Sequence, residues 1–168
     1  MKLLIMSDSH QNIDNMRYAA KQTNPDAIMH LGDHISDAQK LQQMLPDTLV
    51  YMVKGKCDPH GSGEDELFLT IENVKIFMTH GHIYGVKRGF SALTQRARQI
   101  GADIALFGHT HRAALYQEYG MWIMCPGQMQ WQSTFLAASY GIVTIDGNRS
   151  DCVIHMFPNK KKGLLSND

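Results

Sequence analysis

The chain reads Lys2-Leu3-Leu4-Ile5-Met6-Ser7-Asp8-Ser9-His10 near its beginning, a short apolar run that turns abruptly polar. Such a run is typical of a buried parallel strand, which we expect over residues 2–7. Residues 13–22 then place apolar side chains three and four positions apart, which predicts a helix that Pro25 ends. The opening stretch therefore predicts a strand followed by a helix, with Asp8 and His10 directly after the strand.

The same pattern repeats further along the chain. We expect a strand over residues 26–31, a turn at residues 32–33, a helix over residues 38–45 and a third strand over residues 48–54. Strands that alternate with helices pair in parallel through right-handed crossovers, and such sheets bind ligands at the carboxyl ends of their strands. The polar residues that follow each strand are therefore the candidates for a functional site.

The second half of the chain is organised differently. The expected elements are a Gly-rich loop over residues 59–66, a hairpin of residues 67–71 and 74–79, a helix over 86–100, a strand over 104–107 and further strands up to Phe157. These elements predict one α/β domain over residues 1–158, a sandwich of two mixed β-sheets flanked by helices. The polar tail over residues 159–168, which contains Lys160 to Lys162, is expected to be solvated.

Composition excludes several classes of protein. Sixteen Lys and Arg residues balance sixteen Asp and Glu residues, so no overall charge draws the chain to nucleic acid or to an anionic membrane. No apolar run reaches the length of about 18 residues that a membrane-spanning helix needs. Cys57, Cys125 and Cys152 are odd in number and widely spaced, which favours reduced thiols. We expect a soluble, cytoplasmic protein, and these features leave open whether it forms a homo-oligomer.

Side chains able to bind a metal gather at the ends of five expected strands. They are Asp8 with His10, Asp33, the trio Lys56, Cys57 and Asp58, His80 with His82, and His109 with His111. A single Asp or His at a turn is usually a cap or a surface residue, but their occurrence at successive strand ends predicts one metal site. Alternate residues of an extended chain point the same way, so each spaced pair is expected to aim at one point.

The mixture of carboxylates and imidazoles favours a transition metal such as Mn, Fe, Zn or Ni over Ca or Mg, which prefer all-oxygen shells. The remaining histidines are expected to have structural positions. We expect His30 to pack in the core and His34, His60 and His155 to lie on the surface. Three methionines, Met121, Met124 and Met129, are expected to fill the core.

The motif succession resembles that of the calcineurin-like metallophosphoesterases, especially their small bacterial and archaeal phosphodiesterase branch. The matching motifs are Asp8-x-His10, Gly32-Asp33, Gly55-x-Cys57-Asp58, His80-Gly81-His82 and Gly108-His109-x-His111, within residues 2–127. The resemblance implies hydrolysis of a small phosphodiester, or a phosphomonoester, by a metal-activated hydroxide with no side-chain nucleophile.

The resemblance also implies a dinuclear centre, with manganese expected first and nickel, iron or zinc as alternatives. One ion would be held by Asp8, His10, Asp33 and His111, and the other by Asp33, His80 and His109, so that Asp33 bridges them. The resemblance places Cys57, Asp58 and His82 around these ions as catalytic or supporting residues.

One residue departs from the family pattern in a way that bears on function. Lys56 stands where the family has an asparagine that binds the second metal, and a protonated lysine has no lone pair to offer. Lys56 could weaken the second metal site or contact a substrate phosphate as a point charge. Cys57 replaces a histidine that elsewhere protonates the leaving group, and Cys125 to Gln128 stand where the family often has Asn-Pro-Gly-Ser.

Three functions remain open on the sequence. The first is a two-metal hydrolase. The second is a one-metal hydrolase in which Lys56 holds the substrate phosphate. The third is a catalytically inactive scaffold or binding protein, as in the retromer-subunit relatives of the family.

Overall fold

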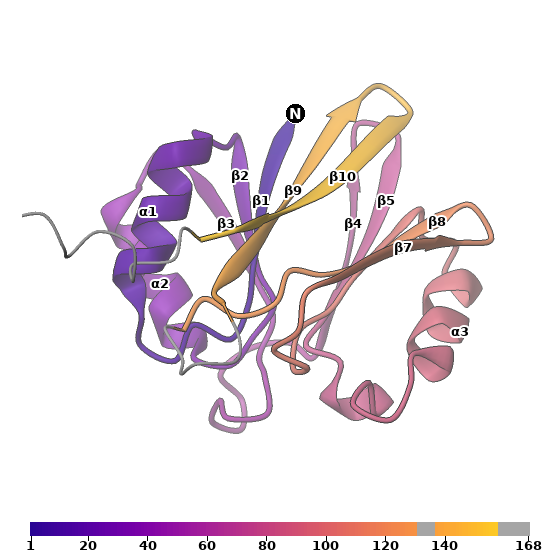
Figure 1. Ribbon diagram of the computed structural model, residues 1–168, viewed down its shortest axis with the longest axis horizontal. Helices are drawn as coiled ribbons and strands as arrows, with labels where there is room; N and C mark the ends of the chain where they lie inside the picture. The colour runs from indigo at the N-terminus through magenta and orange to yellow at the C-terminus, as the bar shows by residue number, and fades with distance from the viewer. Residues whose placement is uncertain (131–136, 158–168) are drawn as a thin grey trace, which may run out of the picture.

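The computed structural model describes residues 1–130 and 137–157 (Figure 1). Its elements are β1 (Lys2–Met6), α1 (Ile13–Thr23), β2 (Ala27–His30), α2 (Ile35–Met44), β3 (Leu49–Met52), β4 (Glu66–Ile71), β5 (Val74–Thr79), the 3₁₀ turn η1 (His82–Tyr84), α3 (Ser91–Gln99), β6 (Ile104–Leu106), β7 (Ala114–Glu118), β8 (Met121–Cys125), β9 (Ser139–Asp146) and β10 (Arg149–Met156). The predicted polar tail, with Lys160 to Lys162, lies outside the described residues.

Ten strands form two sheets of five strands each. In the first sheet the order is β10-β9-β1-β2-β3, with β1, β2 and β3 parallel and β9 antiparallel to β1. In the second the order is β4-β5-β6-β8-β7, with β5, β6 and β8 parallel. Helices α1 and α2 cover the outer face of the first sheet and α3 that of the second (Figure 1). The predicted sandwich of two mixed sheets flanked by helices is confirmed.

Strand β1 shows why its sequence is a continuous apolar run. Leu3 and Ile5 pack between the two sheets, whereas Leu4 and Met6 pack against α1 and α2. Successive side chains of a strand point to opposite faces, and here both faces are covered, so all four side chains are fully buried. Asp8 and His10 are thereby placed directly after the end of β1, the central strand of the first sheet.

The helix expected from Val86 begins five residues later, at Ser91. The intervening backbone contains Gly85 at φ +62° and Gly89 at φ +158°, conformations that a right-handed helix does not use. Val86 is nevertheless buried, with 2% of its surface exposed. Its apolar side chain therefore packs on the core from a loop, and the apolar spacing alone was misleading here.

Other predictions agree more closely with the structure. The hairpin of β4 and β5 forms as expected, although α2 begins at Ile35 rather than at residue 38. His30 is buried, and His60 and His155 are exposed. The three expected core methionines, Met121, Met124 and Met129, are 3%, 0% and 0% exposed. Within residues 1–130 and 137–157, the helices are too short or too polar to cross a membrane.

Replacing Leu106, a fully buried residue of β6 between the sheets, tests this core. We expect Leu106→Ala to lower the free energy of unfolding by about 2–5 kcal/mol, because it leaves a cavity between the sheets. The matched variant Leu49→Ala removes the same atoms from a side chain that is 54% exposed and should cost less than about 0.5 kcal/mol. Urea unfolding of both variants checks this, and equal losses would contradict the arrangement.

Candidate metal centre

The loops that follow β1, β2, β5, β6 and β8 meet at one edge of the sandwich and are joined by hydrogen bonds, among them that from the N–H of Asp8 to the carbonyl of Gly32 at 3.0 Å. The backbone N–H of His109 donates to Asp8 Oδ2 at 3.1 Å. The N–H of Gly108 donates to the carbonyl of His80 at 3.2 Å, and that of Met129 to the carbonyl of Ser7 at 3.1 Å. Side chains that are far apart in the sequence are therefore held together across the two sheets.

The backbone is left-handed at five of the six expected metal ligands. Those residues are Asp8, His10, Asp33, His109 and His111, with φ of 53°, 43°, 56°, 66° and 62°. The expectation that the spaced pairs lie on extended chain is therefore wrong for Asp8 with His10 and for His109 with His111, and only Asp8 and His10 share one group of potential ligands. Such conformations cost about 1 kcal/mol or more per residue outside glycine, so the surrounding contacts must enforce them.

Two glycines let these turns come close to other strands. A Cβ on Gly55 would lie 2.1 Å from the backbone nitrogen of Asp33, and one on Gly108 would lie 2.0 Å from the hydroxyl of Ser7. Both distances are far below van der Waals contact. The glycines of these motifs therefore serve the close approach of the β3 loop to Asp33 and of the β6 loop to β1.

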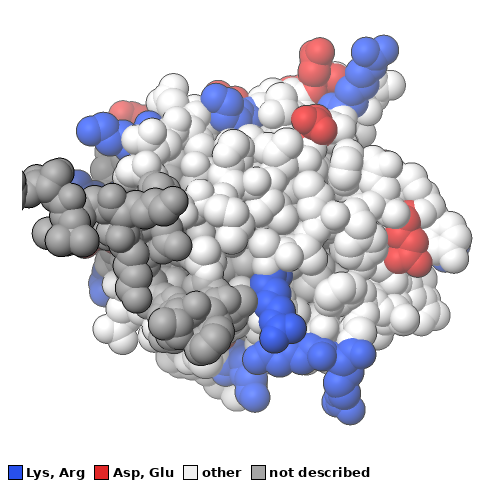
Figure 2. All heavy atoms as spheres, viewed as in Figure 1, with Lys and Arg blue, Asp and Glu red and all other residues white. Residues whose placement is uncertain are grey.

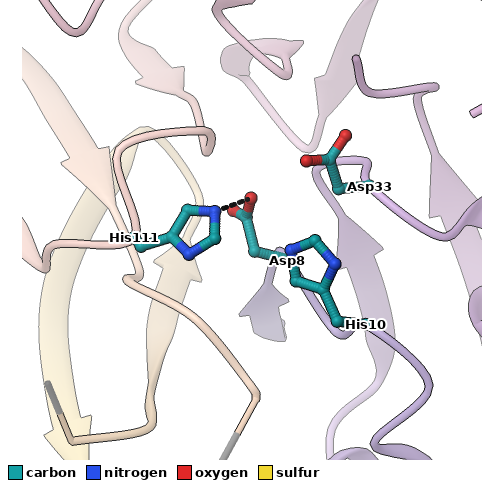
Figure 3. Close-up of side chains that lie close together, drawn as sticks. All are labelled: Asp8, His10, Asp33 and His111. Carbon is teal, nitrogen blue, oxygen red and sulfur yellow. Dashed lines mark ion pairs between the residues drawn. The ribbon is translucent and has the colours of Figure 1, made fainter. Parts of the chain in front are cut away.

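A first group of side chains consists of Asp8, His10, Asp33 and His111, whose potential ligand atoms lie within 4.8 Å of one another. Figure 3 shows that His111 points at Asp8 from the side opposite to Asp33 and His10. Asp8 Oδ1 lies 3.1 Å from His111 Nε2. Among the described residues, neither Asp8 Oδ1 nor His10 Nε2 has a partner with hydrogen-bond geometry, although both atoms are buried. A cation would satisfy both atoms, so these residues fit a divalent metal.

A second group contains Asp33, His80 and His109 and shares its carboxylate with the first. His80 Nδ1 lies 2.7 Å from the carbonyl oxygen of Leu31, so this nitrogen carries the proton and donates it. In neutral His80, Nε2 then presents its lone pair 3.4 Å from Asp33 Oδ1 and 3.2 Å from His109 Nδ1. Such an outward-bonded imidazole is the usual arrangement of a metal-binding histidine.

Charges within the centre shift the pKa values of its members. Burial would raise the pKa of Asp33, but His80 and the N–H of Cys57 outweigh it and hold that pKa well below its usual range. Burial would likewise lower the pKa of His80, yet the Asp33 and Asp8 carboxylates raise it. His80 thus holds a proton more strongly than usual next to two carboxylates. The centre attracts positive charge, as a metal site must.

Two supporting residues were not predicted from the sequence. Gln128 Oε1 lies 2.7 Å from His111 Nδ1 and accepts a hydrogen bond from its N–H, which leaves Nε2 facing Asp8. Asp37, fully buried in the first turn of α2, accepts from Ser9 Oγ at 2.8 Å and from the N–H of Gln11 at 2.7 Å, and so fixes the loop that carries His10. The only feature of the sequence that could have indicated the role of Asp37 is that it is an acidic residue shortly after Gly32-Asp33.

The third strand end supports Asp33. The N–H of Cys57 donates to Asp33 Oδ1 at 2.8 Å, while its exposed thiol has a pKa raised by burial and by the Asp33 carboxylate. The carboxylate of Asp58 accepts from the N–H groups of Ile35 and Gly55, both at 2.7 Å, and so ties the β3 loop to α2. Lys56 lies between Gly55 and Cys57 in the sequence, and its side chain is exposed. Any catalytic role of these residues stays a prediction.

Two further histidines border the centre. The ring of His82 lies 5.4 Å from that of His80 and 6.1 Å from that of His109, outside both groups. His34 was expected on the surface, and this was wrong, because its half-buried ring lies 5.0 Å from that of His10. The left-handed backbone of His34, with φ of 71°, accounts for the difference, since it changes the direction of the chain directly before α2.

Residues 1–148 match the family model of the calcineurin-like phosphoesterase superfamily domain, and the chain belongs to this family. A probable metallophosphoesterase of Bacillus subtilis, YsnB, is 34% identical over 88% of this chain and 86% of its own. A phosphodiesterase of Methanocaldococcus jannaschii is 24% identical over 76% of this chain and 84% of its own. The fold is also that of Entamoeba histolytica Vps29 solved with zinc, at TM-score 0.73 and 19% identity over 94% of this chain and all (100%) of that one.

The buried imidazole of His30 predicts how stability depends on pH. Burial lowers the pKa of His30 to about 4 from 6.5. Between these two pH values the unfolded chain therefore binds a proton at His30 that the folded chain does not bind. Stability from this group is complete above pH 6.5 and is lost as the pH falls toward 4, by about 3 kcal/mol. Urea unfolding at pH 7 and at pH 4 measures how far the free energy of unfolding falls between them. This fall should be larger by that amount in the native chain than in His30→Gln. Parallel pH curves would refute this role.

Proposed function

We propose that the chain hydrolyses phosphate esters, phosphodiesters first and phosphomonoesters second, with two divalent ions held at this centre. The observation that carries the proposal is the carboxylate of Asp33, which belongs to two adjacent groups of potential ligands. Asp8, His10 and His111 would complete the first ion site, and His80 and His109 the second. Manganese suits this mixture of carboxylate and imidazole, with nickel, iron or zinc as alternatives.

The chain's own residues have definite tasks in this proposal. Bound ions would supply an activated water and positive charge that stabilises the developing negative charge at phosphorus. His80 and His111 keep their outer ring nitrogens bonded to Leu31 and Gln128, so their inner nitrogens stay directed at the centre. The N–H of Cys57 holds Asp33, and the carboxylate of Asp58 fixes the same loop by accepting from the N–H of Gly55. Burial and the Asp33 carboxylate raise the pKa of the Cys57 thiol, which is consistent with a mechanism without a side-chain nucleophile.

The phosphodiester preference and the cellular location rest on separate observations. The relative from Methanocaldococcus jannaschii is a phosphodiesterase, which supports a diester as the substrate. Cys57, Cys125 and Cys152 are all free thiols, which supports a reducing, cytoplasmic location.

Two alternatives rest on Lys56, which replaces the expected metal-binding asparagine. The exposed Lys56 directly precedes Cys57, whose N–H bonds to Asp33, and its ammonium could weaken ion binding at the second site and hold the substrate phosphate itself. A scaffold function without catalysis is the other alternative, and the likeness of the fold to Vps29 favours it. The retained ligand set argues against a scaffold, because a binding protein does not need six convergent metal-binding side chains.

Asp33→Asn should remove most activity, because both ion sites lose the same negative charge. We expect turnover of bis(p-nitrophenyl) phosphate with manganese to fall at least about a hundredfold, together with the manganese content per chain. The exposed Asp14→Asn, which makes the same chemical change in α1, is the control and should keep both. Unchanged turnover in Asp33→Asn would reject the proposed centre.

Lys56→Asn separates the alternatives. It adds an amide oxygen donor and removes a positive charge, so the weaker manganese site should bind about tenfold more tightly, as titration of chelator-treated protein would measure. Lys75→Asn, which makes the same change at an exposed position of β5, should leave the affinity unaltered. A loss of turnover in Lys56→Asn would instead support the one-metal hydrolase, and turnover that appears only in this variant would support the scaffold.

A further inference from the structure

The segment that carries most of the second-sheet histidines is unusually basic. Residues 81–114 contain five cations, Lys87, Arg88, Arg96, Arg98 and Arg112, and one acid, Asp103, although the whole chain is neutral. Two of these cations are engaged elsewhere, since Arg96 pairs with Glu66 at 3.0 Å and Arg98 lies over the Tyr119 ring. The other three are exposed and, within residues 1–130 and 137–157, have no acidic group at ion-pair distance.

Two of the unpaired cations belong to the segments that carry the histidines of the centre, Lys87 to the segment after β5 and Arg112 to the segment after β6. Arg112 directly follows His111, and its N–H is tied to Thr110 Oγ1 at 3.3 Å. Lys87 follows the buried Val86, which packs beside Phe107 and anchors the loop to the core. The N–H of Val86 donates to the carbonyl of Gly81 at 3.4 Å, so Lys87 lies one residue from a contact with the residue that follows His80.

The surface beside the centre has the charge and the room for an anionic ligand. Figure 2 shows Lys and Arg side chains gathered at the lower edge of the molecule, where η1 and the loop before β7 lie in Figure 1, with no acidic side chain in view there. A shallow hollow of about 500 Å³ in the same segment is lined by Ile83, Tyr84, Arg88 and Ser91 among others, and Lys87 stands in the sequence between these lining residues. A substrate bound at the centre can therefore extend over this basic surface.

We propose that Lys87 and Arg112 form an anion subsite that binds a second phosphate group of the substrate. The inference rests on the proposed function and names its substrate class: a phosphodiester that carries a further terminal phosphate, as in a 5′-phosphorylated dinucleotide. A simple diester has a single negative charge, which the metal-binding centre takes up. The two unpaired cations beyond it match a dianion, with the lysine as a point charge and the arginine as a planar fork of donors.

The test compares two adenosine dinucleotides that differ only in a 5′-phosphate. With manganese present, we expect the phosphorylated form to have a kcat/KM about tenfold higher, a preference that weakens as salt is raised. Lys87→Ala and Arg112→Ala should each reduce this preference severalfold and leave the rate on the unphosphorylated form nearly unchanged. Lys75→Ala, which removes an exposed lysine near the opposite end of β5 from His80, is the control and should keep the full preference.

A second measurement keeps this subsite testable apart from the reaction. Binding of both dinucleotides to chelator-treated protein, followed by calorimetry, should show the same preference and the same loss in Lys87→Ala and Arg112→Ala. Equal kcat/KM for the two dinucleotides, or a preference that survives both substitutions, would overturn the subsite. If neither dinucleotide is hydrolysed with any of the four metals, the proposed function fails for diesters, and the binding preference alone decides whether the subsite stands.

Discussion

The carboxylate of Asp33 is the constraint on which the rest of the centre depends. It belongs to both groups of potential ligands, so its position sets how far apart two ions could lie. Three separate features hold it: the N–H of Cys57 bonds to Oδ1, His80 faces it from the second sheet, and Gly55 lets the neighbouring loop approach it. A side chain of the first sheet is thus fixed by groups from both sheets, and the sandwich must form before the site exists.

Placing charge at this buried edge requires compensation. Asp8 and Asp33 are almost completely buried, and the cost of removing carboxylates from water is offset by histidines and by backbone N–H groups. Left-handed turns at most of the ligands add strain, which the hydrogen bonds of Asp37 and Asp58 help to hold. The inner shell is therefore arranged for cations, while the unpaired Lys87 and Arg112 outside it suit an anion. A phosphate ester that is bound to metal ions and carries a further anionic group outside them would match this arrangement of charges.

Much of the fold could be predicted because burial imposes a simple pattern on strands. The apolar run of β1 and the polar residues after it were sufficient to expect a buried strand with Asp8 and His10 at its end. Helix boundaries were less predictable, since Val86 packs on the core from a loop and therefore has the same apolar character as a helical residue. His34 was misplaced because a left-handed turn, which the sequence does not reveal, sets its direction.

The sequence by itself determined which side chains are available and that they follow strand ends, because strand periodicity and ligand chemistry are local properties. It also determined the odd lysine at position 56 and the basic character of residues 81–114. Only the tertiary structure decided that Asp33 is shared by two groups and that Gln128 and Asp37 orient the ligand loops. The physical reason is that these relations are distances between segments of different sheets, which no periodicity along one chain encodes.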